Sequence, residues 1–146
     1  MIEQQRNTAP ACCARPTGPP PVLLLAGEPE SARAARRFVR EFIRYHVPGA
    51  SDDYVETVVL VTCEMVTNAI RYGTEPGDSM RVTLDADHAR TQVEVQDPVR
   101  RRPRPRPESK KRDRGRGLII LDALCTAWGV IDTPLGKAVW SEVKAP

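Results

Sequence analysis

Apolar residues recur with a helical spacing in two segments of the first half of the chain. In the segment 30–47 they lie three and four residues apart, which places them on one face of a helix. This stripe consists of Ala35, Phe38, Val39, Phe42 and Ile43. Pro29 suits the first turn of that helix, and Ser51 is a good N-cap for a second helix that should end near Tyr72, before Gly73. The pattern therefore predicts two amphipathic helices in succession.

Alternation of apolar and polar residues predicts the strands of a sheet. The segments 80–86 and 91–97 alternate with period two on either side of a polar turn, which indicates a hairpin. A short apolar run at 22–26 is typical of a strand that lies against the rest of the sheet. The segments 128–132 and 137–143 should form a closing hairpin.

A third helix is expected after a glycine-rich turn, here called the 115–118 turn. The turn consists of Gly115, Arg116, Gly117 and Leu118. Together the elements predict an α+β two-layer sandwich, in which helices cover one face of a mainly antiparallel mixed sheet. We expect residues 1–21 to be a disordered proline-rich leader and residues 22–146 to form one domain, with a basic, proline-rich lid loop at 98–114.

Length and composition limit the possible classes of protein. A chain of 146 residues with 40% hydrophobic content suffices for one domain with a core. No run approaches the roughly 20 apolar residues of a membrane span, and the run 22–26 is too short for a secretory signal, so we expect a cytoplasmic protein. The cysteines, which are Cys12, Cys13, Cys63 and Cys125, lack the spacing of a metal site and should be reduced thiols.

The positive charge is concentrated in one part of the chain. The net charge is only +3, but ten of the seventeen residues from 100 to 116 are Lys or Arg. Such a run is typical of a solvated loop, a lid that faces phosphate, or a nucleic-acid patch. Aromatic residues for base stacking are scarce in this run, so nucleic-acid binding ranks last among these interpretations.

Glu64 and Asn68 are the first candidates for chemistry. They lie four residues apart in the second predicted helix, so both side chains project from one face. They adjoin Met65 and Ala69, which belong to the apolar stripe of that helix. The Asn68 side-chain oxygen suits Mg²⁺, which needs few protein ligands when phosphate oxygens supply the others. The Glu64 carboxylate could act as a general base. Taken alone, the pair is better explained as a capping acid and a helix end.

Asp97 and the 115–118 turn are two further candidates. Asp97 continues the apolar row of Val93 and Val95 at the point where its strand ends, which is an unusual place for an acid. The 115–118 turn opens a helix, where free backbone N–H groups can bind an anion such as phosphate. By itself, the glycine pair in this turn is better explained by a tight turn.

In combination and in this order, these residues resemble a known family. Glu64, Asn68, Asp97 and the 115–118 turn are arranged as in the GHKL nucleotide-binding superfamily, which includes gyrase-type ATPases and sensor histidine kinases. The sequence around Asn68 and that of the closing hairpin around Lys137 are most similar to the anti-sigma-factor serine/threonine kinases. The resemblance covers roughly residues 22–143 and implies the histidine kinase-like (Bergerat-type) ATP-binding fold.

The resemblance implies ATP and Mg²⁺ as cofactors and a role for each candidate. Asn68 would bind the Mg²⁺ that bridges the phosphates, and Glu64 would be the base that acts on a serine or threonine hydroxyl. Asp97 would accept a hydrogen bond from the adenine amino group. The 115–118 turn would approach the phosphates, and an arginine of the basic loop would contact the γ-phosphate. These arginines are Arg112, Arg114 and Arg116.

The implied partners are proteins. An anti-sigma-factor kinase would hold a sigma-factor-like regulator and phosphorylate an anti-anti-sigma-like antagonist, and it could form a homodimer. Two departures from the family pattern favour an alternative, an ATP-responsive interaction module without transferase activity. Pro98 and Val99 follow Asp97 in place of glycines, and Ala138 stands where a hydroxyl residue is common.

Overall fold

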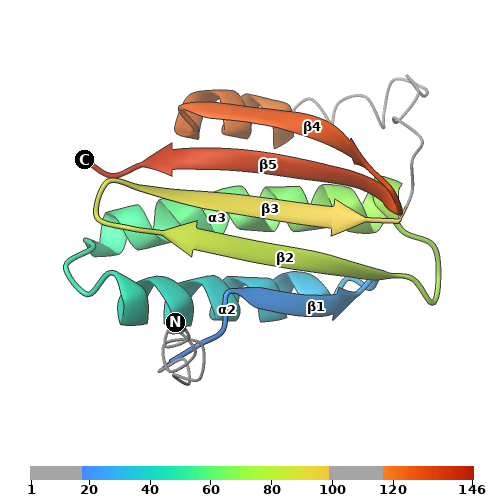
Figure 1. The fold of residues 1–146 in the computed structure, drawn as a ribbon, viewed down its shortest axis with the longest axis horizontal. Helices are drawn as coiled ribbons and strands as arrows, with labels where there is room; N and C mark the ends of the chain where they lie inside the picture. The colour runs from blue at the N-terminus through green and yellow to red at the C-terminus, as the bar shows by residue number, and fades with distance from the viewer. Residues whose placement is uncertain (1–17, 99–116) are drawn as a thin grey trace, which may run out of the picture.

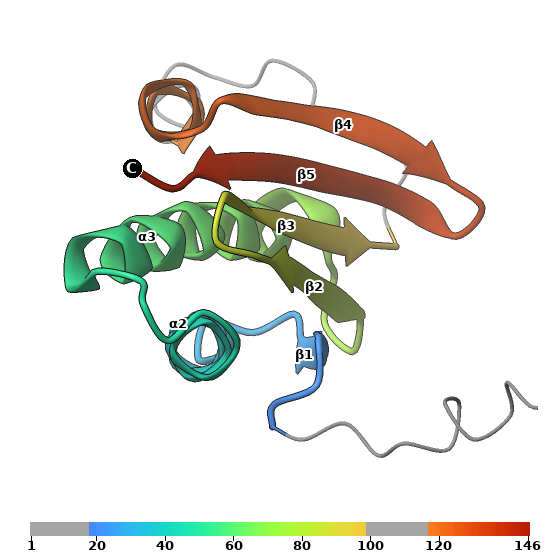
Figure 2. The same cartoon turned by 60° about the vertical axis from the view of Figure 1, so that its left-hand side comes forward.

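The computed structural model describes residues 18–98 and 117–146, and these residues form an open sheet with helices against one face (Figures 1 and 2). The elements are β1 (Val22–Ala26), α2 (Ser31–His46), α3 (Asp52–Asn68), the π-helical turn η2 (Ala69–Gly73), β2 (Ser79–Ala86), β3 (Arg90–Asp97), β4 (Ala127–Thr133) and β5 (Gly136–Lys144). Residues 117–124 are also helical. The predicted α+β sandwich is confirmed.

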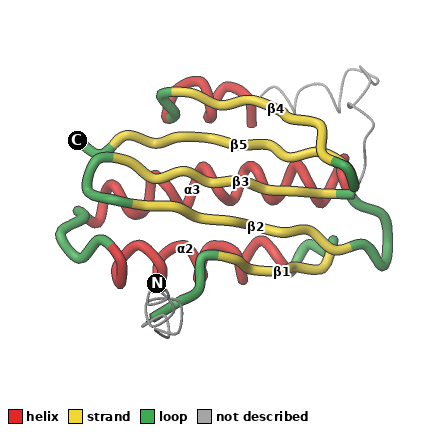
Figure 3. Tube along the Cα trace, in the orientation of Figure 1, coloured by secondary structure: helices red, strands yellow, loops and turns green. Residues whose placement is uncertain are grey.

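The sheet has the strand order β1-β2-β3-β5-β4 (Figure 3). All four pairings of neighbouring strands within the described residues are antiparallel. The sequence pattern predicted a mixed sheet, but no parallel pair is found there because β5 lies between β3 and β4, which run in the same direction. This order brings the start of β5 next to the end of β3.

The two long helices bury the faces that their sequence predicts. The buried side chains of α2 include all five residues of the predicted apolar stripe. Ser51 caps α3, since its hydroxyl accepts a hydrogen bond of 3.2 Å from the backbone N–H of Tyr54. Arg40 of α2 donates two bonds of 2.8 Å to the carboxylate of Glu56 on α3, an exposed ion pair between the two helices that contributes little to stability.

The end of α3 differs from the uniform helix that the sequence predicts. After Asn68 the backbone widens into the π-helical turn η2, which ends at Gly73. The Thr74 hydroxyl donates to the backbone carbonyls of Ala69 and Ile70, at 3.2 and 3.1 Å, and so satisfies carbonyl groups at this helix end. Single π-turns of this kind occur frequently at functional sites.

Parts of the predicted domain organisation lie outside the described residues. These are residues 1–17 of the leader and nearly all of the lid loop 98–114. Within the described part, the Pro21 carbonyl accepts a bond of 2.8 Å from the Leu84 N–H, and Pro19 contacts His46. The domain boundaries therefore stay predictions. None of the helices in 18–98 or 117–146 has the length and apolar character that crossing a membrane requires.

Candidate functional site

Glu64 and Asn68 meet the start of the helical segment 117–124. Both side chains are half-buried on one face of α3. A Cβ atom added to Gly117 would lie 3.0 Å from Asn68 Nδ2 and 3.5 Å from Glu64 Oε2. The absence of a side chain at Gly117 therefore lets this backbone lie directly against the acid and the amide. Gly117 is thus brought together with two residues of α3 that lie far from it in the sequence.

Asp97 forms a buried ion pair with Lys137. The two residues are direct partners in the β3–β5 ladder, so their side chains project from the same face of the sheet. Lys137 Nζ lies 2.9 Å from Asp97 Oδ1. Only 3% of Asp97 and 6% of Lys137 is exposed. Both charged groups have thus lost most of their hydration and depend on local partners.

Gly73, the last residue of η2, packs against the Asp97 carboxylate. A Cβ atom at this position would collide with Asp97 Oδ2 and Cγ. Any larger residue would therefore displace either the carboxylate or the turn. The π-helical turn and its terminal glycine hold the acid in place from the helix side of the sheet.

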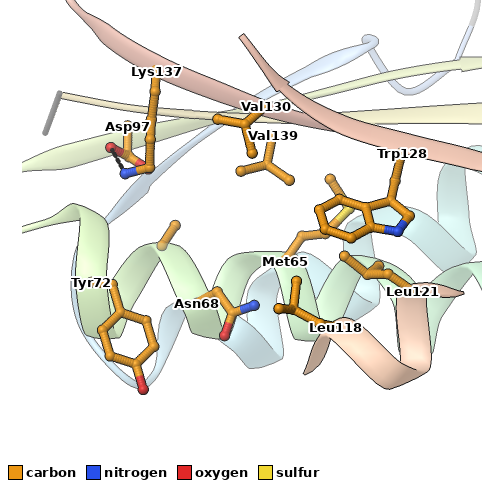
Figure 4. A pocket seen from close by; sticks show the side chains of 11 residues that line it. Met65, Asn68, Tyr72, Asp97, Leu118, Leu121, Trp128, Val130, Lys137 and Val139 are labelled. Atoms are coloured by element: carbon orange, nitrogen blue, oxygen red, sulfur yellow. Dashed lines mark hydrogen bonds and ion pairs between the residues drawn. The ribbon is translucent and has the colours of Figure 1, made fainter. Parts of the chain in front are cut away.

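A pocket of about 320 Å³ is lined by Asn68, Asp97 and Lys137, among other residues (Figure 4). Figure 4 shows Asp97 and Lys137 at one end of the pocket, Trp128 at the other, and Asn68 between them. Most of the lining is apolar and comes from α3, the segment 117–124, β4 and β5. The apolar lining residues are Met65, Ala69, Leu118, Leu121, Val130 and Val139. A pocket of this size and polarity suits a flat organic group with one polar edge.

Trp128 attaches the third helix to the sheet at the far end of the pocket. Its indole N–H donates a bond of 2.8 Å to Asp122 in the segment 117–124. Leu121 of the same segment is 1% exposed and belongs to the main core. These contacts anchor the helix that presents Gly117 to Glu64 and Asn68.

The structure brings together those predicted site residues that it describes. Asn68, Asp97 and Leu118 line the pocket, and Gly117 lies beside Asn68 and Glu64. Gly115 and Arg116 lie outside the described residues, as do the loop arginines Arg112 and Arg114. The structure therefore does not test the predicted contacts of the first half of the 115–118 turn.

Ala138, which stands where a hydroxyl residue is common in the family, lies away from the pocket. It pairs with Gln96 and is not among the pocket residues. Because side chains alternate along a strand, Ala138 points to the opposite face from Asp97. Its neighbour Lys137 occupies the place beside the acid, so the residue at position 138 gives no information about that contact.

Sequence reasoning missed Lys137 as part of the site. A signal was present, because position 137 belongs to the same alternating row as Val139, Ser141 and Val143. The last two of these residues are buried and the first lines the pocket. A lysine at the end of such a row is as unusual as the aspartate at the end of the row in β3. Pairing of β3 with β5 explains both charged residues, because it places Lys137 directly opposite Asp97.

The donor set fits an adenine nucleotide with Mg²⁺. A buried carboxylate can accept a hydrogen bond from the amino group of a nucleobase, and apolar walls can cover the two faces of the base. Among residues 18–98 and 117–146, no group of three or more His, Cys, Asp or Glu could hold a metal ion by itself. The Asn68 amide oxygen could bind Mg²⁺ together with phosphate oxygens and water, because Mg²⁺ needs few protein ligands when phosphates supply the others.

A comparison with known families places the chain in one of them. A family model described as "Histidine kinase-like ATPase domain" matches residues 25–141. This range contains Glu64, Asn68, Asp97, Gly117 and Lys137. A comparison with curated proteins finds no match.

Proposed function

Because the chain belongs to the histidine kinase-like ATPase domain family, we propose that it is an ATP-dependent regulatory serine/threonine kinase of the anti-sigma-factor type. In this proposal it binds Mg-ATP in the pocket between α3 and the sheet and transfers the γ-phosphate to an antagonist protein. This phosphate transfer controls how tightly the chain binds a sigma-factor-like partner.

The contact of Gly117 with both Glu64 and Asn68 is the observation that carries the proposal. At this point a helix start, which favours phosphate, adjoins an amide that suits Mg²⁺ and a carboxylate that can take a proton. Phosphoryl transfer requires mainly such positioning and charge neutralisation. The pocket extends from this point to the buried Asp97, which would receive the adenine.

Each residue has a separate task in this reaction. Asn68 would hold the metal ion, which neutralises charge on the phosphates when it is bound. Glu64 would accept the proton of the attacking hydroxyl, a task that requires it to lie within hydrogen-bond distance of that group. Gly117 would leave room for the phosphates beside both side chains.

Glu64→Gln tests the assignment of the base. This substitution keeps the size of the side chain and removes its ability to accept a proton at neutral pH. Transfer of phosphate to anti-anti-sigma-like proteins of the source organism should fall by about 10²- to 10⁴-fold, while the affinity for Mg-ATP in calorimetry should stay nearly unchanged.

Glu56→Gln is the matched control, because Glu56 lies on the same helix and is exposed. It should transfer phosphate at the wild-type rate. A Glu64→Gln protein that transfers phosphate as fast as this control would disprove the role of Glu64.

A second candidate function is an ATP-responsive interaction module without transferase activity. The replacement of the usual glycines after Asp97 by Pro98 and Val99 favours it, because these residues restrict the approach of the backbone to a base. The kinase assay separates the two candidates. Nucleotide-dependent partner binding without any phosphate transfer would support the module.

A further inference from the structure

The ion pair of Asp97 and Lys137 places a hydrogen-bond acceptor and a donor side by side at one end of the pocket. The two groups are 2.9 Å apart and both line the pocket. The other lining residues with polar side-chain atoms are Asn68 and Tyr72, on α3 and η2, and Trp128 on β4, whose indole N–H is bonded to Asp122. The end wall that the sheet provides therefore carries one carboxylate and one ammonium group on an otherwise apolar surface.

A carboxylate alone distinguishes poorly between adenine and guanine. It accepts hydrogen bonds from the amino group of adenine, but it also accepts them from the N1–H and amino groups of guanine. A fixed hydrogen-bond donor beside the carboxylate adds a second contact by which the two bases can be distinguished. The six-membered ring of adenine presents an amino donor next to the ring nitrogen N1, which is an acceptor, and this order is complementary to an acceptor next to a donor.

Lys137 has the chemistry and the position for this second signal. An ammonium group carries three donors, so it can bind more than one acceptor at the same time. Its bond to Asp97 and its burial restrict where it points. The cross-strand pairing in β3 and β5 sets both backbones, so the two groups keep a defined order along the pocket wall.

We infer that Lys137 is a second adenine-reading residue, which donates a hydrogen bond to N1 of the base while Asp97 accepts one from the amino group. This inference rests on the proposed function, because it requires an adenine nucleotide in the pocket. It adds a specificity-determining residue, and it gives the buried lysine a purpose beyond neutralising Asp97.

The test compares ATP with 1-deaza-ATP on the wild-type protein by calorimetry in the presence of Mg²⁺. The analogue keeps the amino group and replaces N1 by a C–H group, so it removes only the proposed acceptor. Since a hydrogen bond to a charged group is lost, 1-deaza-ATP should bind roughly tenfold more weakly than ATP. The control is 7-deaza-ATP, which is altered on the other ring and should bind like ATP.

A lysine variant assigns the effect to Lys137. Lys137→Met should bind ATP and 1-deaza-ATP with equal affinity, because it has no donor for N1. Since this substitution leaves Asp97 buried without its cation and can unfold the chain, the apolar double variant Asp97→Leu with Lys137→Met, which has no donor for N1, serves as a second test. It should also fail to distinguish the two nucleotides.

The outcomes separate the two proposals. If the wild-type chain binds no ATP, the proposed function fails. If it binds ATP and 1-deaza-ATP equally, or loses as much affinity for 7-deaza-ATP as for 1-deaza-ATP, the role of Lys137 is wrong while the proposed function stands. Discrimination that persists in the folded lysine variants would also overturn the inference.

Discussion

At the scale of single residues, the site depends on close approaches that only glycine permits. Gly117 lies against Asn68 and Glu64, and Gly73 lies against Asp97. The sequence identifies four of these five residues as site candidates by their types and spacing, and Gly73 is the exception. It did not assign a role to Gly73 beyond ending a helix, because its contact partner comes from a strand that follows much later in the chain.

Gly73→Ala should weaken nucleotide binding without unfolding the protein. The added methyl group would displace the Asp97 carboxylate, and loss of a good hydrogen bond to a charged group corresponds to roughly a tenfold loss of affinity for ATP. Gly49→Ala is the control, since nothing lies within 4 Å of a Cβ atom there. Equal ATP affinity of the two variants in calorimetry would show that Gly73 does not position Asp97 for binding.

Asn68→Ala should remove the effect of Mg²⁺ on ATP binding. The variant loses the one amide oxygen that the site offers to the metal ion, so its affinity for ATP should be the same in Mg²⁺ as in EDTA. The measurement is a pair of calorimetric titrations of the wild-type protein and the variant. A full Mg²⁺ effect in the variant would exclude Asn68 as the ligand.

At the scale of elements, the sequence pattern predicts most of the fold and little of the detail at its ends. The two amphipathic stripes, the hairpin 80–97 and the closing hairpin all form as expected, because local periodicity determines which face is buried. The π-turn η2 and the pairing of Asp97 with Lys137 could not be predicted in this way. Both depend on how the end of α3 and the start of β5 meet β3, which is a tertiary property.

Tyr54→Phe should reduce the stability of the contact between α3 and the sheet. The Tyr54 hydroxyl donates to the Val143 carbonyl at 3.0 Å and bonds the Thr91 hydroxyl at 2.8 Å, and both bonds are buried. Their loss should lower the free energy of unfolding in urea by about 1–3 kcal/mol. Tyr45→Phe is the control, because Tyr45 is 49% exposed, and an equal effect of both would contradict the account.

The same hydroxyl predicts a dependence on alkaline pH. Burial raises the pKa of Tyr54 above its ordinary value. A folded-state pKa above the unfolded one means that the contribution to stability is complete at neutral pH and is lost as the pH rises above about 10. Urea titrations at neutral and alkaline pH should therefore show a smaller difference between wild type and Tyr54→Phe at the alkaline pH.

At the scale of the whole molecule, the topology brings three distant segments to one pocket. The helix α3 supplies the acid and the amide, the end of β3 supplies Asp97, and the segment 117–124 closes the far side. Because β5 lies between β3 and β4, Lys137 at the start of β5 lies beside Asp97 in this pocket. In the proposed function, one end of the pocket receives the base and the other end adjoins the phosphates.

A crystal structure of the chain with Mg²⁺ and a non-hydrolysable ATP analogue tests the central claim most directly. The account predicts that the adenine lies against Asp97 and Lys137, with its faces covered by Met65 and Val139, and that the metal ion binds the oxygen of Asn68 beside Gly117. A nucleotide bound elsewhere on the molecule, with this pocket left to solvent, would contradict the account.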